Sequence, residues 1–205
     1  REKISGNEIL CSAIERVIVL DKIDSTNSYA QSLDRPADST VVIASSQTKG
    51  RGRDNREWKS FAEKNISMSI ILDYPKDKDN LGLISILSAN SLVEALEELN
   101  IKSQVKWPND VLVGAKKISG ILSEASFKNN VARSIIVGVG INVNCTSDDF
   151  HKDDYKYRLE PTSILLESGN VTQREDLIVS FLSFYFKWTK EFKIRNYNKI
   201  LDFWK

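Results

Sequence analysis

Apolar residues along this chain recur with two spacings, one typical of strands and one typical of helices. In residues 65–72 they stand at every second position (Ile66, Met68, Ile70 and Leu72), which places them on one face of a strand. Residues 16–23 and 40–46 contain apolar runs that are typical of buried strands. By the same criteria we expect strands over residues 103–107, 110–113, 116–125 and 131–144, with a tight turn at Gly114–Ala115.

Helical spacing appears in two longer segments, residues 81–99 and residues 177–192, and the second predicts an amphipathic helix. Shorter helices are expected over residues 28–33 and near the C-terminus, ending at about Trp204. Strands and helices are mixed without a regular βαβ alternation. We therefore predict an α+β fold, a mixed β-sheet flanked by helices, rather than a doubly wound sheet. Since no repeat or long linker interrupts the pattern, residues 1–205 are predicted to form a single domain.

Composition narrows the classes of function. The 205 residues are 41% hydrophobic and 28% charged, as in a folded soluble domain, and the formal net charge of +1 offers no general attraction for a polyanion such as DNA. Cys11 and Cys145 have neither metal-site spacing nor a disulfide framework, and His151, the only histidine, is interpreted as a surface residue. Without a membrane-spanning run or a signal-peptide core, we expect a cytoplasmic protein with no membrane partner.

Residues 47–59 alternate glycine with arginine directly after a predicted strand. Gly50 and Gly52 allow the backbone to approach a ligand closely. Arg51 and Arg53 can neutralise phosphate, each with two parallel hydrogen bonds. The pattern predicts a mobile loop that closes over an anion. A basic turn that only faces solvent fits the same pattern equally well.

Two further segments combine a turn or strand with charge. In residues 106–110 (Lys-Trp-Pro-Asn-Asp), Asp110 could reach a metal-bound phosphate or a ribose, although an ordinary hairpin turn with Trp107 in the core is the simpler interpretation. In residues 117–124, strand alternation places Lys117 and Ser119 on one face. Such a lysine could contact a carboxylate and its activated phosphate, or it could be an edge-strand lysine that discourages aggregation.

The longest predicted strand has two unlike faces. Alternation places five apolar residues on one face and four small or amide residues on the other: Ile135, Val137, Val139, Ile141 and Val143 against Gly138, Gly140, Asn142 and Asn144. Glycine weakens a strand interior and often marks a close approach of another body, for which a packed helix and a flat ligand such as adenine are both candidates. Residues 25–27 (Ser-Thr-Asn) fit a helix cap, and their hydroxyls could also bind a polar ring.

The combination and order of these motifs closely resemble the catalytic domain of biotin protein ligases, over about residues 17–204 and most strongly over residues 24–144. In chain order the motifs are Ser25-Thr26-Asn27, Gln47-Thr48-Lys49-Gly50-Arg51-Gly52-Arg53 with Arg56 and Trp58, Lys106-Trp107-Pro108-Asn109-Asp110, Lys117-Ile118-Ser119-Gly120-Ile121-Leu122 and Gly138-Val139-Gly140-Ile141-Asn142. The resemblance implies a sheet related to class II aminoacyl-tRNA synthetases. It also implies a reaction with ATP, Mg²⁺ and biotin, in which biotinyl-5'-AMP forms and a lysine of a biotin carboxyl carrier protein then displaces AMP.

The resemblance also implies a role for each motif residue. The implied biotin contacts are Ser25, Thr26, Asn27, Gln47, Gly50, Arg51, Arg53, Lys117, Gly120 and Gly140. The implied nucleotide contacts are Arg51, Arg53, Arg56, Trp58, Lys106, Asn109, Asp110, Lys117 and Asn142. Lys117, Arg53 and Asp110 are the implied catalytic residues, and Asp110 is also the candidate that helps to hold the Mg²⁺ of ATP and to activate the incoming lysine. This chemistry needs positioning and fixed cations rather than an enzyme nucleophile, which agrees with the lack of a catalytic triad.

Both ends of the chain depart from many relatives. The first strand is expected near residue 16, which leaves no room for the N-terminal helix-turn-helix of repressor-type relatives, so no repressor activity is expected. The chain stops at about the point where most relatives begin an SH3-like domain, so we expect that domain to be absent or truncated. Asn55 stands where a glycine is common in the loop.

Three other functions compete with this interpretation. A lipoate ligase or octanoyltransferase shares the ancestral fold, but its Arg-Gly-Gly loop with a nearby His-Asp is not found here. A nucleic-acid-binding module using residues 49–59 is disfavoured by the near-zero net charge. An inactive relative is disfavoured by the intact motifs. The expected partner is a carrier domain of a carboxylase such as acetyl-CoA carboxylase, with no DNA partner, and the chain is expected to be a monomer or a homodimer.

Overall fold

A seven-stranded mixed sheet forms the centre of the computed structural model, which describes residues 7–34, 37–54, 56–73, 82–128, 131–152 and 155–204. The strand order is β1-β2-β3-β7-β6-β5-β4; β1 and β2 are parallel and every other neighbouring pair is antiparallel. The strands are β1 (Arg16–Ile23), β2 (Thr40–Gln47), β3 (Asn65–Asp73), β4 (Gln104–Lys106), β5 (Asp110–Val113), β6 (Lys116–Lys128) and β7 (Val131–Asn142). The helices are α2 (Glu8–Ala13), α3 (Thr26–Ser32), α4 (Gly82–Glu97), α5 (Ser147–Phe150), α6 (Ile164–Ser168), α7 (Arg174–Lys193) and α8 (Tyr197–Trp204).

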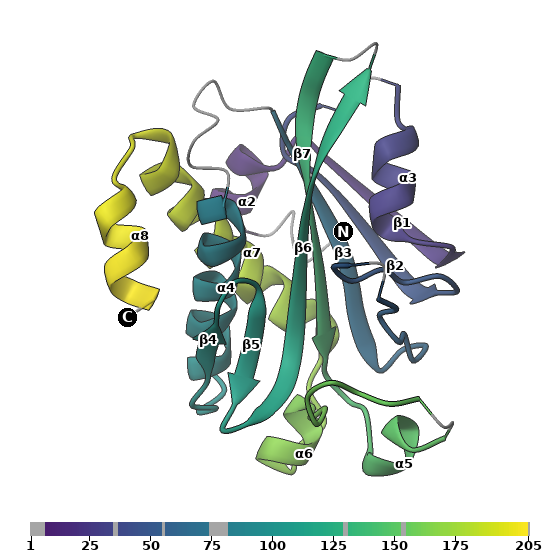
Figure 1. The fold of residues 1–205 in the computed structure, drawn as a ribbon. Coiled ribbons are helices and arrows are strands. Elements are labelled where there is room, and N and C mark those ends of the chain that lie inside the picture. The colour runs from purple at the N-terminus through teal and green to yellow at the C-terminus, as the bar shows by residue number, and fades with distance from the viewer. Residues whose placement is uncertain are drawn as a thin grey trace.

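The two faces of this sheet are covered differently (Figure 1). On one face α4 packs against β6 and α7, and α7 packs against β3, so that the main apolar core lies between the sheet and these helices. On the other face α3 packs over β2, β3 and β7 and covers a small cluster of Ile18, Ala30, Val42, Ile71 and Ile136. The main core contains the five apolar residues that the alternation predicted on one face, Ile135, Val137, Val139 and Ile141 in β7 and Val143 directly after it.

The predicted mixed sheet flanked by helices is confirmed, and most element boundaries lie close to their expected positions. Helix α3 begins at Thr26 rather than Ser28, because the Ser25 side chain caps it by accepting from the Ser28 amide. Strand β7 ends at Asn142 rather than Asn144, because the next two amides donate instead to the Lys64 carbonyl. The predicted start of α4 at Leu81 lies outside the described residues, and Gly114 takes the left-handed conformation that the turn requires.

Both faces of strand β3 are buried, the face with the predicted apolar residues and the opposite face. On the opposite face Ser69 is fully buried, and its hydroxyl lies against α3, 2.6 Å from Asn27 Oδ1 and 2.8 Å from Thr26 Oγ1. Within the described ranges of the chain, no helix is both long and apolar enough to cross a membrane.

Candidate active site

A cavity of about 440 Å³ opens on the sheet face that α3 covers only in part. This volume lies within the range of small-molecule sites. Fifteen of the motif residues expected to contact a ligand line it: Ser25, Thr26, Asn27, Gln47, Arg51, Arg53, Arg56, Trp58, Lys106, Asn109, Asp110, Lys117, Gly120, Gly140 and Asn142. Gly50 is the exception; it lines a second hollow together with Thr48, Lys49, Leu122 and Glu124. The fold therefore brings together segments that are far apart in the sequence.

Hydrogen bonds among neutral groups organise the part of the cavity next to α3, which we call the neutral end (Ser25, Thr26, Asn27 and Gln47). The buried Ser69 hydroxyl supports it by donating to Thr26 and Asn27. The Gln47 Oε1 atom accepts from the backbone amide of Thr26 at 2.8 Å and from its hydroxyl at 3.1 Å. Ser25, Thr26 and Asn27 are each at most 4% exposed. Because the start of α3 is tied to the end of β2 in this way, these polar side chains are held in place before any ligand arrives.

The side-chain amide of Asn27 makes its hydrogen bonds to other groups of the protein. Its Oδ1 accepts from Ser69, and its Nδ2 donates to Glu124 at 2.7 Å and to the Leu122 carbonyl at 3.3 Å. The amide also lies against Gly138, where an added methyl group would overlap it. In this structure Asn27 is therefore a wall of the cavity that ties α3 to β6 and β7.

Charged side chains organise the other part of the cavity, which we call the charged end (Arg53, Lys106, Asn109, Asp110 and Lys117). Lys117 Nζ lies 2.6 Å from Asp110 Oδ1 and 5.7 Å from the centre of the Trp58 ring. Asn109 donates to the Ile121 carbonyl at 2.7 Å, and its Oδ1 accepts from Arg53 at 3.5 Å. The lysine therefore meets both a carboxylate and an aromatic face, and its side chain remains partly exposed to the cavity.

Several alternatives for the motifs of the charged end are now settled. Trp107 is not part of the core, since it is 66% exposed on the hairpin turn between β4 and β5, where its peptide bond to Pro108 is cis. Lys117 is not an edge-strand lysine, because β6 lies between β5 and β7. A bulge in the β5–β6 pairing places Gly120, rather than Ser119, beside the lysine amine, and Ser119 is buried against the Gly140 carbonyl.

The Gly-Arg loop, residues 50–58, is tied across its base like a small hairpin. Arg51 and Glu57 form an antiparallel bridge, and the Trp58 amide donates to the Gly50 carbonyl at 2.9 Å. A side chain at Gly50 would overlap the Trp58 carbonyl, which explains the glycine there. Arg51 is paired with Glu124 at 2.8 Å, while Asn55 lies outside the described residues.

The glycine face of β7 is covered by two different bodies. Gly138 meets Asn27 of α3, which is the helix that we had considered there. Gly140 meets the Trp58 indole, which is neither a helix nor a bound ligand. Asn142 lies two residues after Gly140 in β7. Its side-chain oxygen accepts from the Asn65 amide at 2.8 Å, and its side-chain nitrogen donates to the Thr162 carbonyl at 2.9 Å. The amide of Asn142 is thus used within the protein, although the residue also lines the cavity.

A further wall of the cavity was not identified from the sequence. Its lining residues are Phe61, Met68, Phe150, Tyr155, Tyr157, Arg158, Leu159 and Pro161. Most of them follow β7, in a stretch whose aromatic residues at Phe150, Tyr155 and Tyr157 were the only available signal. His151, in the same stretch, is exposed, as interpreted from the sequence, and is not among the cavity-lining residues.

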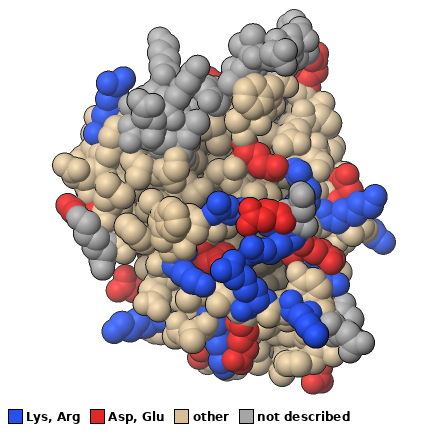
Figure 2. Space-filling model, viewed as in Figure 1, with Lys and Arg blue, Asp and Glu red and all other residues tan. Residues whose placement is uncertain are grey.

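Charges on the surface are mixed in sign. Figure 2 shows that Lys and Arg side chains gather with Asp and Glu side chains in one band across the face in view. Of the arginines lining the cavity, Arg51 is paired with Glu124, and Arg56 with Asp54 at 3.1 Å. A ligand phosphate would meet local cations here rather than a wide basic patch.

The chain belongs to the biotin/lipoate A/B protein ligase family, whose model matches residues 19–142. It is 35% identical to the bifunctional ligase/repressor BirA of Bacillus spizizenii over 93% of its own length and 58% of that protein. It is 27% identical to a biotin–[acetyl-CoA-carboxylase] ligase of Paracoccus denitrificans, over 91% of this chain and 78% of the relative.

Among solved structures, the biotin protein ligase of Aquifex aeolicus in complex with biotin and ATP is similar in fold, with a TM-score of 0.76 and 30% identity. That match covers 91% of this chain and 75% of the other. The chain spans little more than half the length of the Bacillus relatives, 58% in each case.

Proposed function

We propose that this chain is an ATP-dependent ligase that activates biotin as biotinyl-5'-AMP and transfers the biotinyl group to a lysine of a biotin carboxyl carrier protein. The observation that carries the proposal is that one cavity combines the neutral end with the charged end. Biotin has the matching parts, a neutral ureido ring and a carboxylate that must be brought to a phosphate. The names of the Paracoccus and Aquifex relatives support the choice of substrates.

At the neutral end, Ser25, Thr26 and Gln47 are proposed to hydrogen-bond the ureido ring of biotin. Their hydroxyl and amide groups can both donate and accept, as the N–H and C=O groups of that ring require. Gly120 and Gly140 let the Trp58 ring lie close against the strands, and this ring would form the wall of the cavity next to the body of the ligand. Because Thr26 and Gln47 are fixed by hydrogen bonds to one another, biotin would bind with little reorganisation there.

At the charged end, Lys117 is proposed to contact both the biotin carboxylate and the α-phosphate. Arg51, Arg53 and Arg56 would lie over the adenylate from the loop, and Lys106 and Asn109 would complete the nucleotide contacts. A fixed cation beside the phosphate stabilises the charge that develops in the transition state, which is commonly the largest catalytic effect. The ion pair of Lys117 with Asp110 fixes the amine in position.

Mg²⁺ fits this end as a companion of ATP. Magnesium is usually bound through one or two carboxylates together with substrate phosphates, and Asp110 offers one carboxylate with the Asn109 amide beside it. In the described part of the chain, no group of three or more His, Cys, Asp or Glu residues could form a metal site of its own. When bound, the ion would neutralise phosphate charge.

In the first step, a carboxylate oxygen of biotin forms a bond to the α-phosphorus of ATP. The bond from that phosphorus to the pyrophosphate oxygen breaks, and pyrophosphate leaves with the electron pair. In the second step, the acceptor lysine nitrogen attacks the carbonyl carbon of the mixed anhydride and AMP leaves. We assign to Asp110 the proton that the amine loses, since Asp110 is the carboxylate at the charged end of the cavity wall.

The proposed acceptor is the carrier domain of a biotin-dependent carboxylase, on the model of the Paracoccus relative's name. A cytoplasmic location is part of the proposal and is supported by the absence of a disulfide between the two cysteines, Cys11 and Cys145.

The proposal is tested by incubating the chain with Mg-ATP, a carrier domain and either biotin or lipoate, followed by mass spectrometry of the carrier. We expect the mass of one biotinyl group on the carrier lysine and no lipoyl product. Modification by lipoate, or no modification by biotin, would contradict the proposal. A thermal shift with each acid alone separates binding from chemistry.

A further inference from the structure

The aromatic wall of the cavity belongs to a stretch of chain that we call the wall segment, residues 145–161, of which residues 145–152 and 155–161 are described. Its rings form a continuous series with the loop before β3. Phe61 stacks edge-on against Phe150, Phe150 against Tyr157, and Tyr157 against Tyr155, with centroid distances of 5.7, 6.1 and 4.8 Å. The wall segment thus borders the same cavity as the Gly-Arg loop and touches it.

Both ends of the wall segment reach groups that matter to the site. Tyr155 donates to the Glu57 carbonyl at 3.1 Å, and the Lys59 amine lies 4.8 Å from its ring. At the far end, the Lys117 amide donates to the Glu160 carbonyl at 2.7 Å, and the Thr162 amide donates to the Lys117 carbonyl at 2.9 Å. A displacement of the wall segment would therefore also shift the backbone of Lys117.

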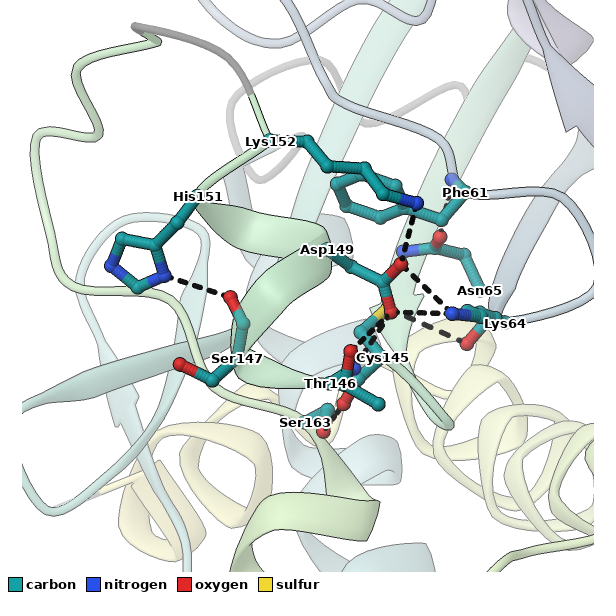
Figure 3. Close-up of polar contacts among 10 residues, drawn as sticks. All are labelled: Phe61, Lys64, Asn65, Cys145, Thr146, Ser147, Asp149, His151, Lys152 and Ser163. Atoms are coloured by element: carbon teal, nitrogen blue, oxygen red, sulfur yellow. Dashed lines mark hydrogen bonds and ion pairs between the residues drawn. The ribbon is translucent and has the colours of Figure 1, made fainter.

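The start of the wall segment is held by a buried carboxylate, Asp149, shown at the centre of Figure 3. Lys64 Nζ lies 2.6 and 2.8 Å from its two oxygens, and the amide and hydroxyl of Thr146 donate to it at 2.8 and 2.9 Å. The Asp149 side chain is 3% exposed, whereas the second cation beside it, Lys152, is 71% exposed and 3.5 Å away. Lys64 is thus the main charge partner of Asp149.

The pKa shifts of Asp149 and of its neighbour Cys145 agree with this geometry. Burial by itself would raise the pKa of Asp149, but the hydrogen bonds from Lys64 and Thr146 outweigh it and hold the pKa well below its usual range. The same burial, together with the Asp149 charge, raises the pKa of the neighbouring Cys145 thiol to about 12. Asp149 is therefore charged at neutral pH, and Cys145 is neutral.

Lys64 joins this cluster to the sheet by its backbone as well. It directly precedes β3, and its carbonyl accepts from the Val143 and Asn144 amides at 3.1 and 2.8 Å, where β7 ends. Helix α5 has four residues, too few to be stable by its own hydrogen bonds, and Phe150 follows Asp149 directly within it. The position of the Phe150 ring therefore depends on where Asp149 is held.

We propose that the Lys64–Asp149 ion pair positions the wall segment against the cavity, so that Lys64 and Asp149 are positioning residues for the nucleotide half of the reaction. Neither side chain lines the cavity, and both lie outside the family motifs quoted above. The inference rests on the proposed function for its kinetic part. The hydrogen bonds that link the wall segment to the site go to the Gly-Arg loop and to Lys117, so ATP should be affected more than biotin.

The test compares Lys64→Gln and Asp149→Asn with two matched controls. Lys152→Gln removes the exposed cation that also lies beside Asp149, and Lys64→Arg keeps a cation that can bind both oxygens of Asp149. For both test variants we expect the KM for ATP to rise about tenfold or more, since small misplacements near a reacting group are costly, with the KM for biotin changed less than about twofold. The two controls should resemble the parent chain.

A second readout needs no turnover. The ligand-free proteins are digested with trypsin, and cleavage after the exposed Lys156 and Arg158 is compared with loss of the whole chain. We expect selectively faster cleavage at these two sites in both test variants. Should Lys64→Gln fail to fold, Asp149→Asn decides alone by the same criteria, because its amide oxygen can still accept from Thr146.

Unchanged cleavage and unchanged KM values in the test variants would overturn the inference. So would an equal rise of both KM values together with uniformly faster digestion, which would show a general loss of stability. If the parent chain does not turn over biotin, the proposed function fails, while the trypsin comparison still decides whether the ion pair holds the wall segment.

Discussion

Thr26 and Gln47 at one end of the cavity are joined by hydrogen bonds between neutral groups, whereas Lys117 and Asp110 at the other end are joined by an ion pair. Thr26 is 3% exposed and Gln47 is half-buried, and the side chains of the charged pair are 27% and 20% exposed. Hydrogen bonds between neutral groups around the buried Thr26 give a rigid template, while the partly exposed charges keep the capacity to exchange one partner for another. The difference indicates that the two proposed tasks, ring recognition and charge stabilisation, can be disturbed separately.

The largest effect is expected from Lys117→Ala. Removing a preorganised cation from a developing phosphate charge should lower the rate of biotinyl-AMP formation by about 10²–10³-fold. Single-turnover formation of the adenylate measures this directly. Lys116→Ala is the control, since its amine pairs with Glu160 and does not line the cavity. A normal adenylate yield in Lys117→Ala would remove Lys117 from its proposed role.

Arg53→Ala should have the next largest effect. Loss of a charge-assisted contact of about 1.5–3 kcal/mol corresponds to an adenylate off-rate that is faster by roughly 10- to 100-fold. The dissociation rate of biotinyl-AMP is the measurement, and Arg133→Ala, an exposed arginine outside the cavity, is the control. An unchanged off-rate would count against a role of the Gly-Arg loop in retaining the intermediate.

Gln47→Ala addresses the neutral end. Loss of the acceptor of Thr26 and of one ligand contact should raise the KM for biotin by about tenfold, with the KM for ATP nearly unchanged. Thr48→Ala changes the adjacent residue, which does not line the cavity and should have no effect. If both KM values rose in parallel in Gln47→Ala, the two ends would not be separable.

The smallest effect is expected from salt, which should weaken binding at the charged end more than binding at the neutral end. Screening of the partly exposed cations should weaken ATP binding a few-fold between ~0.05 and ~0.5 M salt. Binding of biotinamide, which lacks the carboxylate charge, should change by less than about 1.5-fold over the same range. Calorimetric titration of each ligand provides both values, and an equally strong salt dependence of biotinamide would contradict a neutral end.

The sequence predicted the sheet well because strands and their faces depend on local patterns, and the motif residues chosen from such patterns line one cavity. Alternation along β7 was enough to separate its core face from its glycine face, and each motif lies within a predicted strand or in the turn that follows one. The hydrogen bonds of the Asn27 and Asn142 side chains within the protein could not be predicted. Their partners, Glu124 and Thr162, approach them only in the folded chain.

The wall segment was missed for a related reason. Its rings are spaced irregularly along a polar stretch, with neither strand nor helix periodicity. Their order comes from contacts with Phe61 and from the Lys64–Asp149 pair, which joins residues 85 positions apart. The bulge that exchanges Ser119 for Gly120 beside Lys117 likewise follows from strand pairing rather than from composition.

The most direct test of a single cavity with a neutral and a charged end is biotin-dependent exchange of labelled pyrophosphate into ATP by this chain, without an acceptor protein. The account predicts exchange with biotin that needs Mg-ATP, that is lost in Lys117→Ala, and that does not occur when lipoate replaces biotin. Absence of exchange with biotin, or equal exchange with lipoate, would contradict it.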